Sequence, residues 1–214
     1  MSTNPHPNRA SPWRAARCWR REAVPAALRS WLLDTGSLTR RLQAQCAGAF
    51  AVRVLAQDWA RPLRSEARAL GLRDGEAALV RQVYLLCAGV PWVYARTVIP
   101  ASSLTGAARR LGKLGTRPLG AALFAEPTLE RGALEIARVV PGDPIYGGAC
   151  AALTTAPAAI WGRRSVFRVR GKALLVSEFF LPRLWAGDHL NHRHPLPNPL
   201  PRAGEGGSVR PARR

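Results

Sequence analysis

The chain has 214 residues, of which 47% are hydrophobic and 21% are charged. This composition is typical of a globular protein, and the length suits one domain with a sizeable hydrophobic core. Lys and Arg together number 32, against 13 for Asp and Glu, so the formal net charge is +19. A balance this basic normally points to nucleic acid or to an anionic surface as a partner.

The distribution of the charge argues against a nucleic-acid partner. Residues 1–21 contain five Arg and no acidic residue, and residues 189–214 contain five Arg and one Glu. Both ends are rich in Pro and polar residues and lack the apolar periodicity of a packed element. We therefore expect a disordered basic arm over residues 1–22, one domain over residues 23–188 and a disordered tail over residues 189–214.

The histidines and cysteines exclude several kinds of site. All four histidines lie in the two ends, which leaves the expected domain without a His-based triad or a His-ligated metal. The four cysteines form no C-x-x-C pair, so we expect no zinc or other metal site and no thioredoxin-type motif, and, without a signal peptide, reduced thiols in a cytoplasmic protein. The N-terminus lacks the apolar region of a signal peptide, and no apolar run is long enough to cross a membrane. The residues are His6, His189, His192, His194, Cys18, Cys46, Cys87 and Cys150.

The first regular pattern after residue 25 is helical. Leu28, Trp31 and Leu32 have the i, i+3, i+4 spacing of an amphipathic helix, and Gly36 ends it. Ser37 is a suitable N-cap for a second helix over SLTRRLQAQC. The two segments together predict a helical hairpin.

Strand patterns dominate the rest of the chain. Residues 104–124 are an exception and look helical, with a break at Gly115 and a restart at Pro118. Residues 141–160 read as a long loop with one helical turn. A Gly-containing link at 88–90 and a type II′ turn at Gly171-Lys172 predict hairpins, and hence an α+β fold with a mainly antiparallel sheet. The expected strands span 49–57, 77–87, 91–100, 133–140, 166–170 and 173–182.

Two charged residues interrupt apolar strands. Alternation puts Glu178 on one face with Val176 and Phe180, where a carboxylate is costly unless it is paired or protonated. Arg81 shares a face with Leu79 and Val83 in the same way, and a guanidinium there is suited to holding a carboxylate. Two alternatives stay open. Glu178 belongs to a solvent-facing or edge strand, or Arg81 forms a structural ion pair, with Glu178 itself as a candidate partner.

The remaining motifs are less informative. Arg163 and Arg164 are adjacent in a strand, so at most one of them faces a shared pocket. Arg96 reads as a surface or rim cation. The segment LGKLGTRPLG matches neither phosphate-binding glycine motif, and a hydrolase with paired carboxylates lacks its second acid.

Several segments, in this order and spacing, resemble the bacterial chorismate pyruvate-lyase family. They are LRSWLLDTGSLTRRL, RQVYLLCAGVPWVYARTVIP, LGTRPLGAALF, LEIARV and WGRRSVFRVRGKALLVSEFFLP, and they cover about residues 28–182. The resemblance implies a single-domain α+β fold with a six-stranded antiparallel sheet and an internal site under helical flaps. It also implies conversion of chorismate to 4-hydroxybenzoate and pyruvate, for ubiquinone synthesis, without a cofactor.

The resemblance also implies roles for four residues. The carboxylate-binding arginine of the family falls on Arg81, and the glutamate that contacts the hydroxyl end falls on Glu178, the expected catalytic pair. Leu38 and Leu119 fall on two positions that bind ligand through the backbone. For the enolpyruvyl carboxylate of chorismate the candidates are Arg163, Arg164 and Arg131.

Two other functions remain open at this stage. The same fold serves, by resemblance, as the effector-sensing domain of bacterial regulators, but only about 22 residues precede the first helix here, too few for a winged helix. A non-catalytic carrier of 4-hydroxybenzoate, with basic ends that touch anionic lipid, is the second. We expect a monomer that takes chorismate as its small-molecule partner, with neither nucleic acid nor stable membrane insertion.

Overall fold

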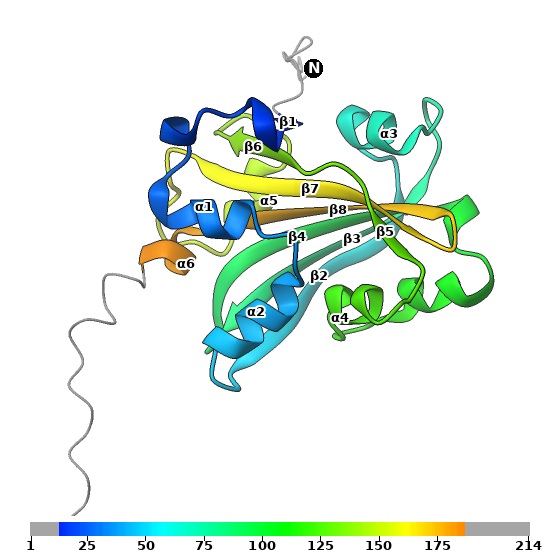
Figure 1. The fold of residues 1–214 in the computed structure, drawn as a ribbon, viewed down its shortest axis with the longest axis horizontal. Helices are drawn as coiled ribbons and strands as arrows, with labels where there is room; N and C mark the ends of the chain where they lie inside the picture. The colour runs from blue at the N-terminus through cyan, green and yellow to red at the C-terminus, as the bar shows by residue number, and fades with distance from the viewer. Residues whose placement is uncertain (1–12, 187–214) are drawn as a thin grey trace, which may run out of the picture.

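All six expected strands occur in a computed structural model of the protein, which describes residues 13–186 (Figure 1). Two short strands that the sequence did not predict join them, so the sheet has eight strands and not six. Every pairing is antiparallel, in the order β1-β6-β7-β8-β4-β3-β2, with β5 paired to β7. The α+β class is confirmed. The strands are β1 (Arg14–Ala15), β2 (Phe50–Ala60), β3 (Ala78–Cys87), β4 (Val90–Pro100), β5 (Leu129–Arg131), β6 (Glu135–Val139), β7 (Ile160–Val169) and β8 (Lys172–Phe180).

Two tight hairpins hold the centre of the sheet in register. Ala88 and Gly89 join β3 to β4 with φ angles of 48° and 79°, and Arg170 and Gly171 join β7 to β8 with 51° and 74°. Positive φ at both positions defines a type I′ turn, which matches the twist of the flanking strands. The expected type II′ turn at Gly171-Lys172 is therefore wrong in type and by one residue.

Strand β7 begins six residues earlier than the sequence predicted. Arg163 and Arg164, which the sequence placed in a strand, lie in this earlier, buried part of β7. Each of them meets an acidic partner on a neighbouring strand, Glu178 on β8 and Glu135 on β6. These pairs compensate charges that a buried strand would otherwise exclude.

The expected helical hairpin is confirmed, with Ser37 Oγ accepting a hydrogen bond from Arg40 N at the start of its second helix. A single helical turn lies in the long segment 141–160, as expected. Residues 104–124 are helical only in part, because short 3₁₀ turns precede a helix that starts after Pro118. The sequence analysis made no prediction for α3. The helices are α1 (Ala26–Leu32), α2 (Leu38–Gln45), α3 (Arg64–Leu70), α4 (Leu119–Phe124), α5 (Tyr146–Cys150) and α6 (Pro182–Ala186).

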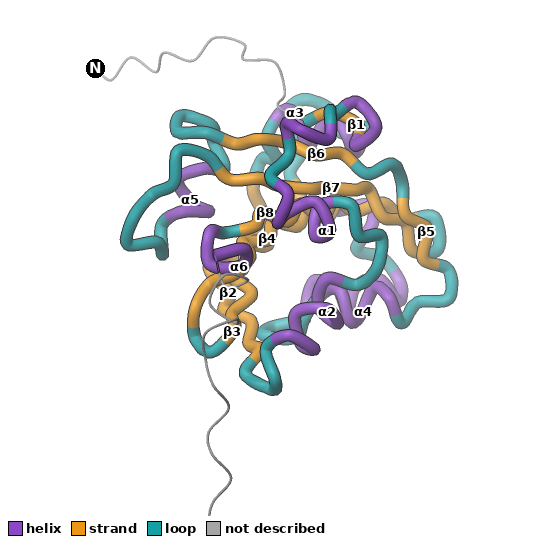
Figure 2. Tube along the Cα trace, turned by 60° about the vertical axis from the view of Figure 1, so that its left-hand side comes forward, coloured by secondary structure: helices purple, strands orange, loops and turns teal. Residues whose placement is uncertain are grey.

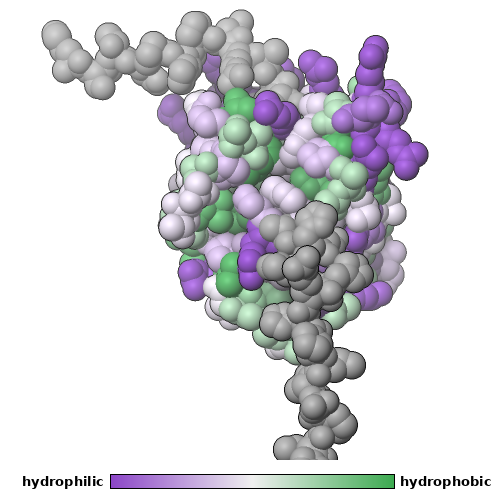
Figure 3. Space-filling view, turned by 90° about the vertical axis from the view of Figure 1, so that its left-hand side faces the viewer, coloured by the Kyte–Doolittle hydropathy of each residue, from purple (hydrophilic) through white to green (hydrophobic). Residues whose placement is uncertain are grey.

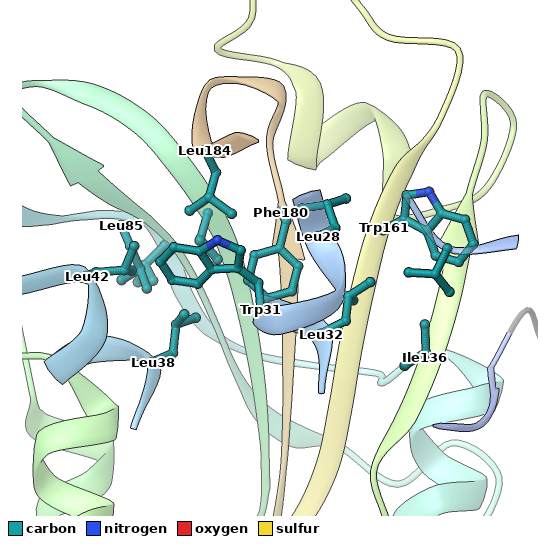
Figure 4. Close-up of a cluster of buried hydrophobic side chains, with 13 residues drawn as sticks. Leu28, Trp31, Leu32, Leu38, Leu42, Leu85, Ile136, Trp161, Phe180 and Leu184 are labelled. Atoms are coloured by element: carbon teal, nitrogen blue, oxygen red, sulfur yellow. The ribbon is translucent and has the colours of Figure 1, made fainter. Parts of the chain in front are cut away.

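Helices cover both faces of the sheet. On one face α1 and α2 cover one half, and α4 covers the other half (Figures 1 and 2). In Figure 4, Trp31 of α1 lies against Phe180 of β8, within a cluster that excludes water from that half. The opposite face packs against α3 and α5.

The expected basic arm is partly structured. Arg14 and Ala15 pair with β6, and Trp19 Nε1 donates a hydrogen bond to the carbonyl of Ile136 at 3.1 Å. The ring of Trp19 meets the edge of Trp161 at 5.0 Å, so an apolar side chain holds this segment on the sheet. Residues 1–12 and the expected tail over 189–214 lie outside the described residues.

Few of the large apolar side chains within residues 13–186 are exposed. On the face in Figure 3, hydrophobic residues are scattered in small groups among hydrophilic ones. Among residues 13–186, no helix is long and apolar enough to cross a membrane.

A disulfide joins Cys46 to Cys87, which contradicts the expectation of reduced thiols for this pair. Cys46 caps the C-terminus of α2, and Cys87 ends β3 opposite Phe50. The pair is 41 residues apart in the chain, so spacing alone gave no sign that the β2–β3 register brings it together.

This disulfide predicts a stability effect. Replacing both cysteines by Ser should lower the free energy of unfolding by about 2–4 kcal/mol, because a cross-link over a long loop restricts the unfolded chain. Denaturant titration of the wild type and the double variant would measure it. Cys18→Ser, which removes an exposed free thiol, is the control and should leave the unfolding midpoint unchanged. Equal midpoints for all three proteins would contradict a stabilising role.

Candidate functional site

A cavity lies between the sheet and the helices α2 and α4. The empty space is about 490 Å³ with its open mouth included. The sheet forms the floor of the cavity. At its centre the side chains are short, because Ala95 and Thr97 of β4 face the cavity. The lining residues are Thr39, Val52, Arg81, Val83, Leu85, Ala95, Thr97, Pro118, Leu119, Gly120, Leu123, Phe124, Phe167, Val176 and Glu178.

The cavity brings together the two charged residues that the sequence analysis singled out. Thr97 of β4 pairs with Arg81 on one side, and Ala95 of β4 pairs with Glu178 on the other. Strand β4 therefore separates Arg81 from Glu178, which places them on backbones about 10 Å apart across the sheet. They face one cavity from different strands and mark its opposite sides.

Arg81 is buried, and none of the ion pairs within residues 13–186 includes it. Its Nη2 donates to the carbonyl of Gly115 at 2.8 Å, and its Nε is buried with no hydrogen-bond partner among the described residues. Burial lowers the pKa of the Arg81 guanidinium. An uncompensated buried cation with a free donor is the chemistry of an anion-binding site.

Glu178 is paired, but not with Arg81. Its Oε2 accepts from Arg163 Nε at 2.6 Å, which excludes the ion pair between Glu178 and Arg81 that the sequence left open. Arg163 Nη1 also donates to the carbonyls of Trp31, at 2.7 Å, and of Asp34. In the part of the chain that the structure describes, no hydrogen bond occupies Glu178 Oε1, so this oxygen is available to accept one from a ligand.

A second arginine lies beside this end of the cavity. Arg131 of β5 donates from Nε to Ser165 Oγ at 3.1 Å and from Nη1 to the carbonyl of Thr35 at 2.8 Å. Its guanidinium lies 5.2 Å from the ring centre of Phe167, which lines the cavity. Burial is the main cause that lowers the pKa of Arg131, and the nearby charge of Arg163 lowers it further.

The other two arginines of interest serve the opposite face of the sheet. Arg164 Nε meets Glu135 at 2.7 Å. Arg96 was expected at the surface or rim, and this is wrong, because it is buried and its Nε meets the buried Glu66 at 2.7 Å. Glu66 lies on α3, outside every motif that the sequence offered.

The two leucines expected to bind ligand through their backbone are separated. Leu119, the first residue of α4, lines the cavity. Leu38, the first residue of α2, packs into the apolar cluster under α1 and is not among the lining residues. Its neighbour Thr39 faces the cavity instead, and helix periodicity in SLTRRL did not distinguish the two.

Thr39 and Gly120 mark where α2 and α4 touch over the cavity. A methyl group on Gly120 would stand 2.7 Å from Thr39 Oγ1, so any larger residue requires Thr39 to shift. Figure 2 shows the two helices side by side on the cavity side of the sheet. They form the cover of the cavity.

The arrangement suits an anionic, ring-shaped ligand with a polar group opposite its carboxylate. Arg81 supplies the cationic end, Glu178 supplies the acceptor, and apolar side chains, Phe124 and Phe167 among them, line the space between. Among the described residues, no group of three or more His, Cys, Asp or Glu side chains could hold a metal ion.

Comparison with known proteins identifies the family of this chain. The family model described as "Chorismate lyase" matches residues 9–189. The chain belongs to the chorismate lyase family. It is accordingly a lyase, and the family resemblance read from the sequence is confirmed.

Relatives in this family are similar over most of the chain. A protein of Aromatoleum aromaticum named "Probable chorismate pyruvate-lyase" is 49% identical over 166 residues, 77% of this chain and 89% of the relative. A protein of Methylococcus capsulatus with the same name is 46% identical over 155 residues, 72% of this chain and 94% of the relative. The family's domain is thus present nearly in full.

The fold has a wider distribution than the chorismate lyase family. The effector domain of PhnF from Mycobacterium smegmatis superposes with a TM-score of 0.51 at 19% identity, over 70% of this chain and 91% of that domain. At this identity the likeness concerns the fold alone.

Proposed function

We propose that this protein converts chorismate to 4-hydroxybenzoate and pyruvate, and that the product supplies ubiquinone synthesis. The observation that carries the proposal is the buried Nε of Arg81, which has no hydrogen-bond partner among the described residues and belongs to the same cavity as Glu178. These two groups match the two ends of 4-hydroxybenzoate, a carboxylate and a hydroxyl group. Family membership and the named relatives support the same reaction.

The cavity orients the substrate by its charges. Chorismate carries a ring carboxylate and an enolpyruvyl carboxylate, so a basic domain attracts it from solution. Arg81 binds the ring carboxylate, which aims the opposite, hydroxyl-bearing carbon at Glu178. Holding both ends fixes the reacting carbon beside its base and removes an entropic part of the barrier.

The chemistry is an elimination that needs no external reagent. Glu178 accepts the proton from the ring carbon that carries the hydroxyl group. The electron pair of that C–H bond forms the last ring double bond, and the ether bond to enolpyruvate breaks. Enolpyruvate takes up a proton and becomes pyruvate, so the atoms of chorismate are fully accounted for by the two products.

The surroundings strengthen these contacts. Arg163 anchors Glu178 at 2.6 Å and is itself fixed by two backbone carbonyls, so the base keeps one orientation. A largely apolar cavity lowers the local dielectric and makes each charged contact stronger than in water. The same contacts hold the product, which predicts slow release.

Turnover of chorismate by the purified protein, without added metal, tests the proposal. Pyruvate and 4-hydroxybenzoate are followed together, and the expected result is equal formation of both. Tight binding of 4-hydroxybenzoate without turnover would contradict a lyase reaction and indicate a binding function for the same cavity. Absence of both turnover and binding would contradict the assignment of the ligand as well.

Slow release predicts an effect of the contact between α2 and α4. Gly120→Ala should force Thr39 and the two helices apart, and dissociation of 4-hydroxybenzoate should become several-fold faster. Stopped-flow displacement measures this rate. Gly147→Ala is the matched control, because no atom lies within 4 Å of its added methyl. Adding Thr39→Ala to Gly120→Ala should restore slow release, and a single variant as slow as wild type would contradict the role of this contact.

A further inference from the structure

Three arginines are candidates for the second carboxylate of chorismate, and the structure separates them. Arg164 points to the opposite face of the sheet, where Glu135 pairs with it at 2.7 Å and the carbonyl of Ser65 accepts from Nη1. It has no access to the cavity.

Arg163 lies on the cavity side of the sheet, but it already forms an ion pair with Glu178. Its side chain is 2% exposed, its Nε is bound to Glu178, and its Nη1 is bound to the carbonyls of Trp31 and Asp34. Its charge is compensated by the same Glu178 that serves the hydroxyl end. Binding a second carboxylate would require Arg163 to give up the contacts that hold Glu178 in place.

Arg131 differs from the other two because no acidic side chain among the described residues forms an ion pair with it, whereas Arg163 and Arg164 each have one. Nε and Nη1 are fixed by Ser165 and Thr35, while none of the hydrogen bonds within residues 13–186 uses Nη2. The residue is half-buried, so its guanidinium is held in place yet reachable. Its guanidinium lies over the ring of Phe167, which lines the cavity. It interacts electrostatically with Arg163, Glu178 and Asp34.

The electrostatics of this corner favour an incoming anion. Asp34 is engaged by Arg41 at 3.2 Å and by the backbone N–H of Gly36 at 2.7 Å. Burial raises the pKa of Asp34, but these contacts outweigh burial and lower it. With Asp34 occupied by Arg41, and Glu178 by Arg163, the charge of Arg131 has no ion pair among the described residues.

We propose that Arg131 binds the enolpyruvyl carboxylate of chorismate and holds it while the ether bond breaks. This inference rests on the proposed function. The ether oxygen is attached to the ring carbon next to the hydroxyl-bearing carbon, so the enolpyruvyl group lies at the Glu178 side. Arg131 therefore distinguishes substrate from product, because 4-hydroxybenzoate no longer carries that carboxylate.

The test is a comparison of substrate and product affinity in Arg131→Ala. We expect the Kd of chorismate, measured in the first milliseconds or with turnover blocked by Glu178→Gln, to rise about 10- to 100-fold, the worth of a charge-assisted hydrogen bond. The Kd of 4-hydroxybenzoate should stay within about twofold of wild type by the same scale. Arg131→Lys, which keeps the charge, should recover part of the substrate affinity.

A matched control separates this effect from a general loss of charge. Arg168→Ala removes an exposed cation from β7, the strand paired with β5, and should leave both affinities unchanged. Parallel loss of substrate and product affinity in Arg131→Ala would overturn the inference, because it would indicate a structural role through Thr35. Unchanged chorismate affinity would overturn it too. Failure of the wild type to turn over chorismate contradicts the proposed function instead, and the two affinities still test Arg131.

Discussion

Arg81→Gln is expected to weaken the binding of 4-hydroxybenzoate by about 10²- to 10³-fold, because losing one partner of a buried charge pair costs about 2–5 kcal/mol. The effect is large because the buried Nε of Arg81 has no hydrogen-bond partner among residues 13–186, which leaves it available to the ligand carboxylate. Turnover at low chorismate concentration should fall at least as much. Isothermal titration with the product, together with kcat/KM for chorismate, measures both effects.

Two controls distinguish a loss of binding from a folding defect. Arg81 also donates to the carbonyl of Gly115, in the connection that leads to α4, so the thermal midpoint must be measured alongside. Arg81→Lys keeps the charge but not the planar pair of donors, and should retain an intermediate affinity. A well-folded Arg81→Gln that binds product as tightly as wild type would contradict the assignment of Arg81 to the carboxylate.

Glu178→Gln is expected to lower kcat by about 10²- to 10⁴-fold, the usual contribution of a general base. Product affinity should change far less, because an amide still offers a hydrogen-bonding oxygen to the hydroxyl end. The split between kcat and product affinity identifies Glu178 as a proton acceptor rather than only a contact. Single-turnover kinetics with chorismate give the chemical step directly.

The ion pair with Arg163 dictates the choice of variant. Glu178→Ala would leave Arg163 buried without a partner, and breaking a buried pair in this way costs about 3–5 kcal/mol of stability. Glu135→Gln is the matched control, because it weakens the equivalent cross-strand pair with Arg164 on the other face. It should leave turnover unchanged. Equal losses of kcat in the two variants would contradict a chemical role for Glu178.

The sequence located the two principal side chains because of strand alternation. A charge at a position that faces the core is visible in the pattern of a single strand, and both Arg81 and Glu178 stood out in this way. The hairpins and the Ser37 cap were also local signals. Whether the two charges met each other depended on the order of strands, with β4 placed between them, and this the pattern did not contain.

Several of the predictions that failed concern partners that lie far apart in the chain. Arg96 looked like a rim cation because its partner Glu66 lies on a helix 30 residues away. Cys46 and Cys87 looked like free thiols for the same reason. The strand expected at 166–170 stopped short of Arg163 and Arg164, whose acidic partners lie on β8 and β6.

We propose that one cavity binds both ends of an aromatic acid, with Arg81 at the carboxylate and Glu178 at the hydroxyl group. The most direct test is calorimetric titration of 4-hydroxybenzoate, benzoate and phenol into wild type, Arg81→Gln and Glu178→Gln. The wild type should bind 4-hydroxybenzoate more tightly than either analogue. Arg81→Gln should lose the preference over phenol, and Glu178→Gln should lose part of the preference over benzoate. Wild-type preferences in both variants would contradict the account.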